Sequence, residues 1–425
     1  MGSFGSDLNI GKSIIQHKCR VCGSESAAPF ADLGVSPIAN EMLNREDSIR
    51  VSENFYPLNA VVCKRCWLVQ LTYSHPAKSL FTNNYPYYSS FSETWVAHAE
   101  SYASQMVQRM QLNSVMRVVE VASNDGYLLR YFKSLGINVL GIEPCQNVAE
   151  AARELHGIPT ISEFFGSELG RKTAIDYGFA NLMVANNVLA HVPDTIDFLT
   201  GFKELLAPDG IATFEFPHLL KLIQQNQFDT IYHEHYCYLS LVAVKNALEL
   251  VGLRPFDVET LATHGGSLRL FVCHAEASYS QTKNLLMLEE AEVLAGLKLS
   301  ETYSKFQEKV WETKRNLLKF LIDAKENGKT IVGYGAPAKG NTLLNFCGIG
   351  TDFLDFTVDI SPHKQGLMLP GSRIPVYDPE VIRDFKPDYV LILPWNLSGE
   401  IMRQHSYIKD WGGRFVVPIP EVRVL

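Results

Sequence analysis

Residues 116–132 read MRVVEVASNDGYLLRYF, an apolar run, a small polar turn and a second apolar segment. This order is typical of a buried β-strand followed by a helix. The pattern returns in residues 137–155, and two more strand-like runs follow in residues 179–192 and 210–217. Strands that alternate with helices predict an α/β fold with a parallel, Rossmann-like sheet and ligands beyond the carboxyl ends of the strands.

A second α/β unit is predicted further along the chain. Residues 285–327 are charged and apolar in helical alternation, which indicates a helical arm. Residues 330–346, TIVGYGAPAKGNTLLNF, again predict a strand, a turn and a helix, and DFTVDI and DYVLILPW predict further strands. We therefore expect a smaller C-terminal lobe, and domains at 1–80, 81–282 and 283–425, because 425 residues suggest two or three domains.

Charge and hydropathy restrict the partners of this chain. The 38 basic and 46 acidic residues give a net charge of −8, and no basic run stands out. Proteins that bind nucleic acid usually carry a basic face, so a small-molecule ligand is the better expectation. No apolar run is long enough to cross a bilayer. The first residues lack the basic-then-apolar order of a signal peptide, which predicts a cytoplasmic protein.

Two cysteine pairs lie near the N-terminus, in CRVC and CKRC. Their four thiols are Cys19, Cys22, Cys63 and Cys66. Two such knuckles can wrap one tetrahedral Zn²⁺, and four thiolates would close the site, so the zinc would be structural. A redox pair and coincidence are the alternatives. The other four cysteines are scattered and are expected to be buried or incidental thiols.

The turn EVASNDG at 120–126 resembles the acidic, glycine-rich loop of S-adenosylmethionine (SAM) methyltransferases, with Ala122 where glycine is usual. Glu143 ends the next strand, seventeen residues after Gly126, where a carboxylate can accept ribose hydroxyls. NAD would suit that carboxylate too, but the G-x-G-x-x-G turn that a pyrophosphate needs is missing. The predicted cofactor residues of the strand ends are Glu120, Ala122, Asn124, Asp125, Gly126, Glu143, Pro144, Asn186 and Asn187.

Residues 231–240, IYHEHYCYLS, gather two histidines, a glutamate and three tyrosines. His233, Glu234 and His235 could bind a metal, but the H-E-x-x-H spacing of a helical zinc site is absent. A structural polar cluster is a further alternative. A proton-transfer site is the third interpretation, and the rest of the chain favours it.

The order of these motifs, together with YPYYSS, HGGSLR and WGGRFVVPIPEV, closely resembles the nucleotide-sugar C-methyltransferases, in particular the dTDP-4-keto-deoxysugar C-3 methyltransferases. The resemblance runs from about residue 17 to the end. It implies a zinc-binding N-terminal domain, a central SAM-dependent methyltransferase domain and a C-terminal substrate-binding lobe. It also implies a catalytic Tyr-x-Glu-His set at Tyr232, Glu234 and His235.

Further ligand-binding residues follow from the same resemblance. The aromatic ligand loop of the family falls on Tyr85, Tyr87 and Tyr88, with Tyr85 next to the cofactor. His191 follows the predicted strand that ends in Asn186 and Asn187, and is expected to face the substrate. Lys339 and Asn341 lie in a glycine-rich turn at a predicted helix N-terminus, a place suited to the diphosphate. The implied substrate is a nucleotide-linked keto-sugar.

The chemistry of carbon methylation points the same way. Carbon attacks a sulfonium methyl only as an enolate, so the enzyme needs a base and a donor for the enolate oxygen. We expect His235 to be the base, because a neutral imidazole is available near pH 7. Glu234 would orient that imidazole, and Tyr232 would donate to the enolate oxygen. Glu234 acting as the base itself is the main alternative.

Two other functions compete with this hypothesis. The C-terminal turn would suit an NAD-dependent nucleotide-sugar oxidoreductase. The paired cysteines would suit a zinc-ribbon protein that binds nucleic acid, although the negative charge opposes it. For the methyltransferase we expect no nucleic-acid or membrane partner, and a monomer or a small homo-oligomer.

Overall fold

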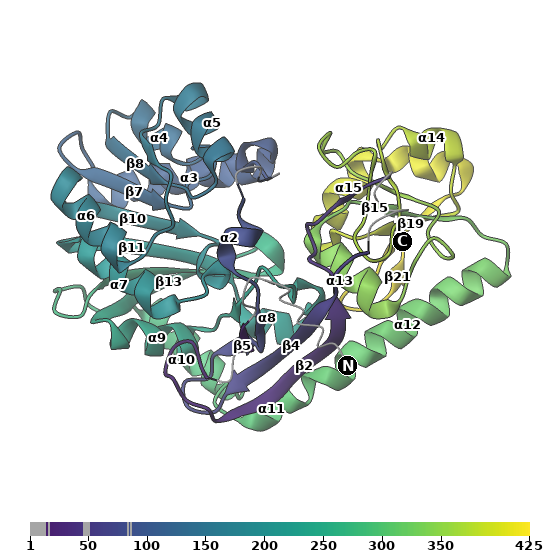
Figure 1. The fold of residues 1–425 in the computed structure, drawn as a ribbon, viewed down its shortest axis with the longest axis horizontal. Helices are drawn as coiled ribbons and strands as arrows, with labels where there is room; N and C mark the ends of the chain where they lie inside the picture. Colours follow the sequence, from purple (N-terminus) through teal and green to yellow (C-terminus); the bar gives the residue numbers. More distant parts are fainter. Residues whose placement is uncertain (1–13, 16–17, 46–51, 83–84, 86) are drawn as a thin grey trace, which may run out of the picture.

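The structure is a computed structural model that describes residues 14–15, 18–45, 52–82, 85 and 87–425. Residues 1–13, which bear on the export signal, lie outside the described part of the chain. Two α/β lobes face each other across a strand module formed by the N-terminal segment, and helix α12 (Phe306–Glu326) runs along the module to the C-terminal lobe (Figure 1). No helix of the described residues is long and apolar enough to span a membrane.

The N-terminal module is an antiparallel sheet in the order β12-β5-β4-β2. Its strands are β2 (Ala27–Ser36), β4 (Tyr56–Cys63), β5 (Val69–Leu71) and β12 (Cys237–Tyr238). Strand β12 comes from the IYHEHYCYLS stretch, so the central lobe contributes the edge strand of this module. Smaller pairs join β1 (Ile14–Ile15) to β6 (Tyr73–Ser74), and β3 (Leu43–Asn44) to β17 (Leu367–Met368) of the C-terminal lobe.

The central lobe is built on a seven-stranded sheet in the order β13-β14-β11-β10-β7-β8-β9. Its strands are β7 (Arg117–Val121), β8 (Asn138–Ile142), β9 (Thr160–Ile161), β10 (Ala180–Asn186), β11 (Leu206–Pro217), β13 (Leu253–Leu261) and β14 (Ser267–His274). Five neighbouring strands of this sheet are parallel to one another, as expected: β11, β10, β7, β8 and β9. Strands β13 and β14 are antiparallel because the short turn η4 (Thr263–Gly265) joins them directly, so the sheet is mixed rather than fully parallel.

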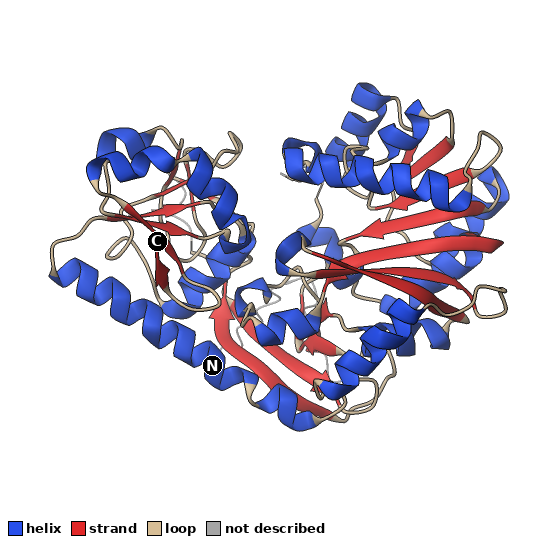
Figure 2. Ribbon diagram, turned by 180° about the vertical axis from the view of Figure 1, so that it is seen from behind, coloured by secondary structure: helices blue, strands red, loops and turns tan. Residues whose placement is uncertain are grey.

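Helices cover both faces of the central sheet (Figure 2). They are α3 (Glu93–Met110), α4 (Leu129–Ser134), α5 (Gln146–His156), α6 (Ser167–Tyr177), α7 (Thr195–Leu205) and α9 (Leu241–Leu250), whereas α8 (Leu219–Gln224) packs against the strand module. Alternate residues of β7 enter opposite cores: Val118 packs with the core of α3 and α4, whereas Val119 and Val121 pack with that of α6 and α7. This alternation explains the continuous apolar run that predicted the strand.

The C-terminal lobe follows helices α10 (Lys283–Leu294) and α11 (Ser300–Ser304). Its six-stranded sheet has the order β18-β16-β15-β19-β20-β21. The strands are β15 (Ile331–Tyr334), β16 (Thr357–Val358), β18 (Val376–Tyr377), β19 (Tyr389–Ile392), β20 (Arg414–Val417) and β21 (Arg423–Val424). The helices of the lobe are α13 (Ala338–Cys347), α14 (Val381–Phe385) and α15 (Ser398–Gln404). This lobe and the strand module share one core, where Phe30 stacks on Phe306 at 4.5 Å between ring centres.

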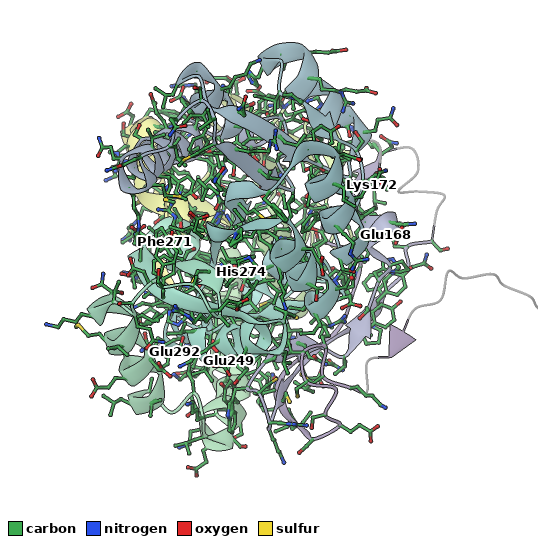
Figure 3. All side chains as sticks on the ribbon, turned by 90° about the vertical axis from the view of Figure 1, so that its left-hand side faces the viewer. Glu168, Lys172, Glu249, Phe271, His274 and Glu292 are labelled. Carbon is green, nitrogen blue, oxygen red and sulfur yellow. The ribbon has the colours of Figure 1, made fainter. Side chains whose placement is uncertain are left out.

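Helix α10 is tied to the central lobe by one buried carboxylate. Glu292, labelled in Figure 3, accepts hydrogen bonds from the backbone N–H groups of Leu241 and Val242 at 2.7 and 2.8 Å. It also lies 2.7 Å from Nε2 of His218. A carboxylate at the N-terminus of α9 satisfies donors that the helix leaves without partners. The first helix of the predicted arm is therefore anchored on the central lobe.

Candidate active site

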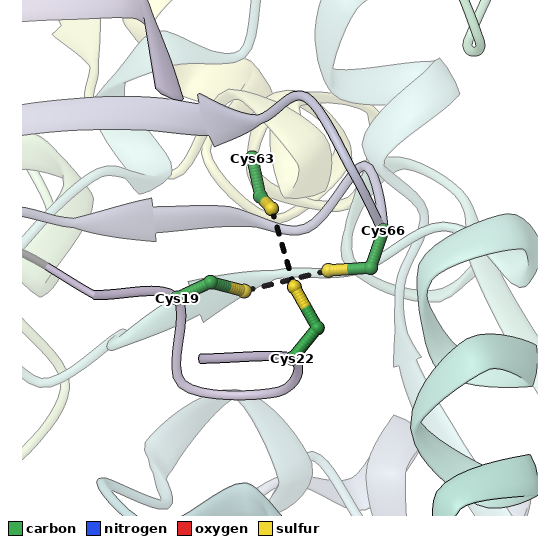
Figure 4. A group of neighbouring side chains, drawn as sticks. All are labelled: Cys19, Cys22, Cys63 and Cys66. Atoms are coloured by element: carbon green, nitrogen blue, oxygen red, sulfur yellow. Dashed lines mark hydrogen bonds between the residues drawn. The ribbon is translucent and has the colours of Figure 1, made fainter. Parts of the chain in front are cut away.

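The four predicted cysteines come together in the N-terminal module (Figure 4). All four Sγ atoms lie within 4.8 Å of one another, with 3.4 Å between Cys19 and Cys66 and 3.5 Å between Cys22 and Cys63. Tetrahedral thiolate zinc, with Zn–S bonds of about 2.3 Å, needs sulfur–sulfur distances of roughly 3.8 Å. The four thiols are therefore positioned to hold one metal ion, with the four protein ligands that a closed, structural zinc site requires.

The turn after β7 has the left-handed backbone that a close ligand approach requires. Ala122, Asn124 and Gly126 have φ angles of +54°, +49° and +79°. Ala122 therefore occupies a conformation that costs an alanine about 1–2 kcal/mol, which explains why glycine is usual at this position. A side chain on Gly126 would meet Cβ of Ala152 in α5 at 3.3 Å, so this glycine also lets the turn and α5 approach each other.

Glu143 lies directly behind this turn. Its two carboxylate oxygens accept hydrogen bonds from the backbone N–H groups of Asn124 and Cys145, at 3.0 and 2.9 Å. Burial raises the pKa of Glu143. The carboxylate that was predicted to bind ribose hydroxyls is thus held at the turn, with half-buried Pro144 beside it.

Buried polar atoms without a partner among the described residues gather at the carboxyl ends of β7 and β10. They are Oε2 of Glu120, Oγ of Ser123, Oδ1 of Asp125, Oδ1 of Asn186 and Oδ1 of Asn187. An unsatisfied buried polar atom costs about 1–3 kcal/mol, so such a group of them fits a ligand with hydroxyl and amino donors. SAM has both kinds of donor, and the predicted cofactor residues therefore suit it.

The aromatic loop lies against the same turn. Asn124 accepts a hydrogen bond from the N–H of Ser89 at 2.7 Å and donates to the carbonyl of Tyr87 at 3.2 Å. Asn147 pairs with the backbone of Tyr85 at 3.0 and 3.2 Å and donates to the hydroxyl of Tyr88 at 3.0 Å. The predicted aromatic and cofactor residues thus come together, with the Tyr87 ring more than half exposed.

Residues 229–236, which we call the tyrosine–histidine loop, place His235 beside Tyr232. The N–H of His235 donates to the carbonyl of Tyr232 at 2.9 Å, and this tight turn brings the two rings to 4.0 Å. Nδ1 of His235 lies 2.8 Å from the Thr230 carbonyl, and Nε2 lies 2.8 Å from the Tyr232 hydroxyl. A carbonyl only accepts, so Nδ1 carries the hydrogen and Nε2 the lone pair. Burial holds the pKa of His235 well below its usual range.

Glu234 has a different partner from the one expected. The side-chain amide of Asn40 donates to its Oε2 at 2.6 Å, and burial raises the pKa of Glu234 to about 7. Both nitrogens of His235 are already engaged, so the Thr230 carbonyl, and not Glu234, orients the imidazole. Adjacent residues of this irregular loop point in different directions, which separates the carboxylate from the ring.

His191 joins the tyrosine–histidine loop from the end of β10. Its ring meets that of His235 edge-on, with 4.6 Å between the ring centres. Burial lowers the pKa of His191 to about 4, so it is neutral at pH 7. Asn187 directly follows β10, and its amide nitrogen is 3.2 Å from Nε2 of His264. The structure therefore brings together His191, Tyr232 and His235.

The two predicted residues of the C-terminal turn have different surroundings. Nζ of Lys339 donates to Oδ1 of Asn396 at 2.7 Å and lies 4.7 Å from the centre of the Trp395 ring. Asn341 is buried, and its amide donates to the carbonyl of Ala39 at 2.6 Å. The Asn341 amide nitrogen is therefore an internal link to the N-terminal module, whereas Lys339 is on the side of the tyrosine–histidine loop.

Two contacts of this site were not predicted from the sequence. Asn40 lies 194 positions before the carboxylate that it binds. Thr230 offers only its backbone carbonyl, which any residue type would supply. No spacing pattern could have revealed Thr230, and the only signal for Asn40 was an asparagine in the loop after β2.

Comparisons with known proteins identify the family. Residues 95–258 match the family model of a methyltransferase domain, and residues 262–420 match that of a C-methyltransferase C-terminal domain. Residues 19–81 match a model described as "Putative zinc binding domain". The C-methyltransferase NovU of Streptomyces niveus is 38% identical over 411 residues, which are 96% of this chain and 96% of that protein.

Solved methyltransferases match part of the chain. The magnesium protoporphyrin IX methyltransferase of Synechocystis PCC 6803 with bound SAM has 13% identity and a TM-score of 0.33, covering 42% of this chain and 79% of its own. A SAM-dependent methyltransferase of Anabaena variabilis has 11% identity and a TM-score of 0.34, covering 41% and 84%. The sequence relative and the family models, which together span nearly the whole chain, place it among the SAM-dependent C-methyltransferases, and the chain belongs to that family.

Proposed function

We propose that this enzyme transfers the methyl group of SAM to C-3 of a nucleotide-linked 4-keto-deoxysugar, through an enolate. The observation that carries the proposal is the pairing of His235 with Tyr232 in a buried loop. A neutral imidazole whose Nε2 lone pair is held only by the neighbouring phenol supplies a base and a hydrogen-bond donor at one place. Methylation of carbon next to a ketone requires those two groups.

The roles of the residues follow from this arrangement. The Thr230 carbonyl keeps the hydrogen on Nδ1 of His235, so Nε2 takes the proton from the substrate carbon. Before that transfer, Tyr232 turns its hydroxyl from Nε2 to the oxygen of the ketone, which frees the Nε2 lone pair and places a donor where negative charge develops. Glu120, Glu143, Asn186 and Asn187 would hold SAM, which supplies an electrophilic methyl group when it is bound. His191, Tyr87 and Tyr88 would line the sugar.

The nucleotide is proposed to lie on the C-terminal lobe. Lys339 is at the first turn of α13, where backbone N–H groups and the helix dipole favour an anion. Desolvation lowers the pKa of Lys339, and nearby Asp229 opposes that shift. A diphosphate there would place the sugar towards the tyrosine–histidine loop. The relative named C-methyltransferase favours methyl transfer over the oxidoreductase and the nucleic-acid alternatives.

The proposal is tested with a panel of nucleotide-linked keto-sugars and SAM. For dTDP-4-keto-6-deoxyglucose we expect a product that gains one methyl group by mass spectrometry, with formation of S-adenosylhomocysteine. Carbon-13 methyl-labelled SAM and NMR then locate the new methyl group. C-5 is also next to the ketone, so a methyl at C-5 would overturn the C-3 assignment, and no methylation of any keto-sugar would overturn the substrate class.

The base is identified by hydrogen–deuterium exchange at the substrate carbon in the presence of S-adenosylhomocysteine. Loss of a general base lowers the rate by about 10²–10⁴-fold, so His235→Asn should abolish most of the exchange. Glu234 has a pKa of about 7, so a share of it is the carboxylate at neutral pH and could act as an alternative base. If Glu234→Gln stops exchange while His235→Asn does not, Glu234 is the base.

A further inference from the structure

The tyrosine–histidine loop belongs to the central part of the chain, but the C-terminal lobe holds its first residues. The turn η3 (Phe228–Thr230) ends just before Tyr232, and its last residue, Thr230, orients His235 through its carbonyl. Next to it, the carbonyl of Ile231 accepts a hydrogen bond from the hydroxyl of Thr342 on α13, at 3.1 Å. The backbone that sets the imidazole is therefore supported from the opposite lobe.

The second contact is shorter and is made to a carboxylate. Nε1 of Trp395, in the turn after β19, donates a hydrogen bond of 2.7 Å to Oδ2 of Asp229. Asp229 is fully buried and the Trp395 side chain is almost so. A hydrogen bond to a buried carboxylate is charge-assisted, and no solvent competes for it, so it constrains the position of η3.

Trp395 is held in place from two other directions. A side chain built on Gly265 would meet the far edge of the indole at 2.7 Å, so this glycine leaves room for the ring. On another side, Nζ of Lys339 lies 4.7 Å from the ring centre. The indole thus lies against Gly265 in the turn η4, against the proposed diphosphate-binding lysine, and against the turn η3 that precedes His235.

We propose that Trp395 and Asp229 are positioning residues for the base, through the chain Trp395 Nε1–H, Asp229 carboxylate, Thr230 carbonyl and His235 Nδ1–H. The inference rests on the proposed function, in which His235 removes the proton. It assigns the C-terminal lobe a part in the proton transfer itself, in addition to binding the nucleotide. Neither residue touches the substrate carbon, so their effect is on the placement of Nε2.

The test is Trp395→Phe, which keeps an aromatic ring over Gly265 and under Lys339 but removes the N–H donor. A displacement of a catalytic group can lower a rate by about 10²-fold, so we expect a 10- to 100-fold fall in kcat and in the exchange rate at the substrate carbon with S-adenosylhomocysteine bound. The KM for the nucleotide sugar should change less than threefold. The affinity for SAM, by calorimetry, and the zinc content should be unchanged.

Trp411→Phe is the matched control. Nε1 of Trp411 also donates to an oxygen of the same lobe, the Pro387 carbonyl at 3.0 Å, but outside the tyrosine–histidine loop. This variant should keep the wild-type kcat and exchange rate. Asp229→Asn is the second variant, because its amide oxygen still accepts from Trp395. It should retain more exchange than Asp229→Ala.

The outcomes separate the two proposals. If the wild-type enzyme shows neither exchange nor methylation with any keto-sugar of the panel, the proposed function fails. If the wild type is active and Trp395→Phe exchanges the proton at the wild-type rate, the positioning role is wrong. It is also wrong if Trp411→Phe loses as much activity, or if only the KM of Trp395→Phe changes.

Discussion

The central and C-terminal lobes repeat one supersecondary unit, a strand, a turn, a helix and a parallel strand followed by an acidic residue. In the central lobe, Glu143 after β8 accepts a hydrogen bond from the backbone of Asn124 in the first turn, at 3.0 Å. In the C-terminal lobe, Asp359 after β16 does the same with the backbone of Ala336, at 2.7 Å. The backbone geometry is thus shared by the two units.

Their electrostatics differ. Nζ of Lys364 lies 3.7 Å from the Asp359 carboxylate and donates to the Ala336 carbonyl at 2.9 Å. Among the described residues, Glu143 has no such cation, and burial raises its pKa. A carboxylate without a cation favours neutral hydroxyl donors, whereas a turn flanked by lysines favours an anion. The two units therefore differ in charge, and this difference supports the proposal of a nucleoside at one and a phosphate at the other.

Loss of the zinc site should disturb the module that connects the two units. Cys63→Ser should lower the zinc content from about one ion per chain to well below that, because three ligands no longer close a structural site. Elemental analysis measures the zinc, and limited proteolysis detects unfolding of the module. Cys273→Ser, in buried strand β14, is the control and should keep the zinc. Full zinc content in Cys63→Ser would refute the assignment.

Glu143→Ala should weaken SAM binding by roughly 1.5–3 kcal/mol, since it removes a charged acceptor for the ribose hydroxyls. Calorimetry measures this loss, and the KM for the nucleotide sugar should stay the same. Asp359→Ala is the mirror variant: it releases the Ala336 N–H and Lys364, which the carboxylate holds at the turn, so it should raise that KM while leaving SAM affinity unchanged. Equal effects of both variants on SAM would show that the two units do not bind separate ligands.

Lys339→Ala should raise the KM for the nucleotide sugar about tenfold, as expected for one charge-assisted contact to a phosphate. The dissociation constant of SAM should not change. Lys314→Ala is a matched control, because Nζ of Lys314 also lies 4.7 Å from an aromatic ring centre, that of Phe346, in the same lobe. Steady-state kinetics with both variants would contradict the diphosphate site if their KM values rose equally.

The smallest effects are expected from the turn residues with left-handed backbone. Gly335 has φ +89°, and a side chain there would meet Cδ of Pro394 at 2.5 Å, so Gly335→Ala should destabilise the protein by about 1–3 kcal/mol. Ala122→Gly relieves strain but loosens the unfolded chain, so it should stabilise by only about 0.5 kcal/mol. Thermal unfolding measures both, and destabilisation by Ala122→Gly would argue against strain at this turn.

Local spacing in the sequence was sufficient to predict much of the structure of this protein. The pairs Cys19–Cys22 and Cys63–Cys66 predicted one zinc cluster, and the four thiols do meet where one metal ion could bind them. The strand–turn–helix patterns predicted both α/β lobes, because strand and helix periodicity are properties of neighbouring residues. The position of Glu143 after the second strand was also predictable, since parallel strands end at one edge of a sheet.

Tertiary packing decided how the site is assembled. The resemblance to the Tyr-x-Glu-His motif led us to expect that Glu234 orients His235. In the folded chain, the Asn40 amide binds the Glu234 carboxylate, and the Thr230 carbonyl binds the imidazole. The contact between Trp395 and Asp229 joins residues 166 positions apart. Hydrogen-bond partners across such separations depend on how whole lobes pack, and a backbone carbonyl carries no signature of residue type. Spacing along the chain therefore located the chemical groups, and only the fold determined which of them meet.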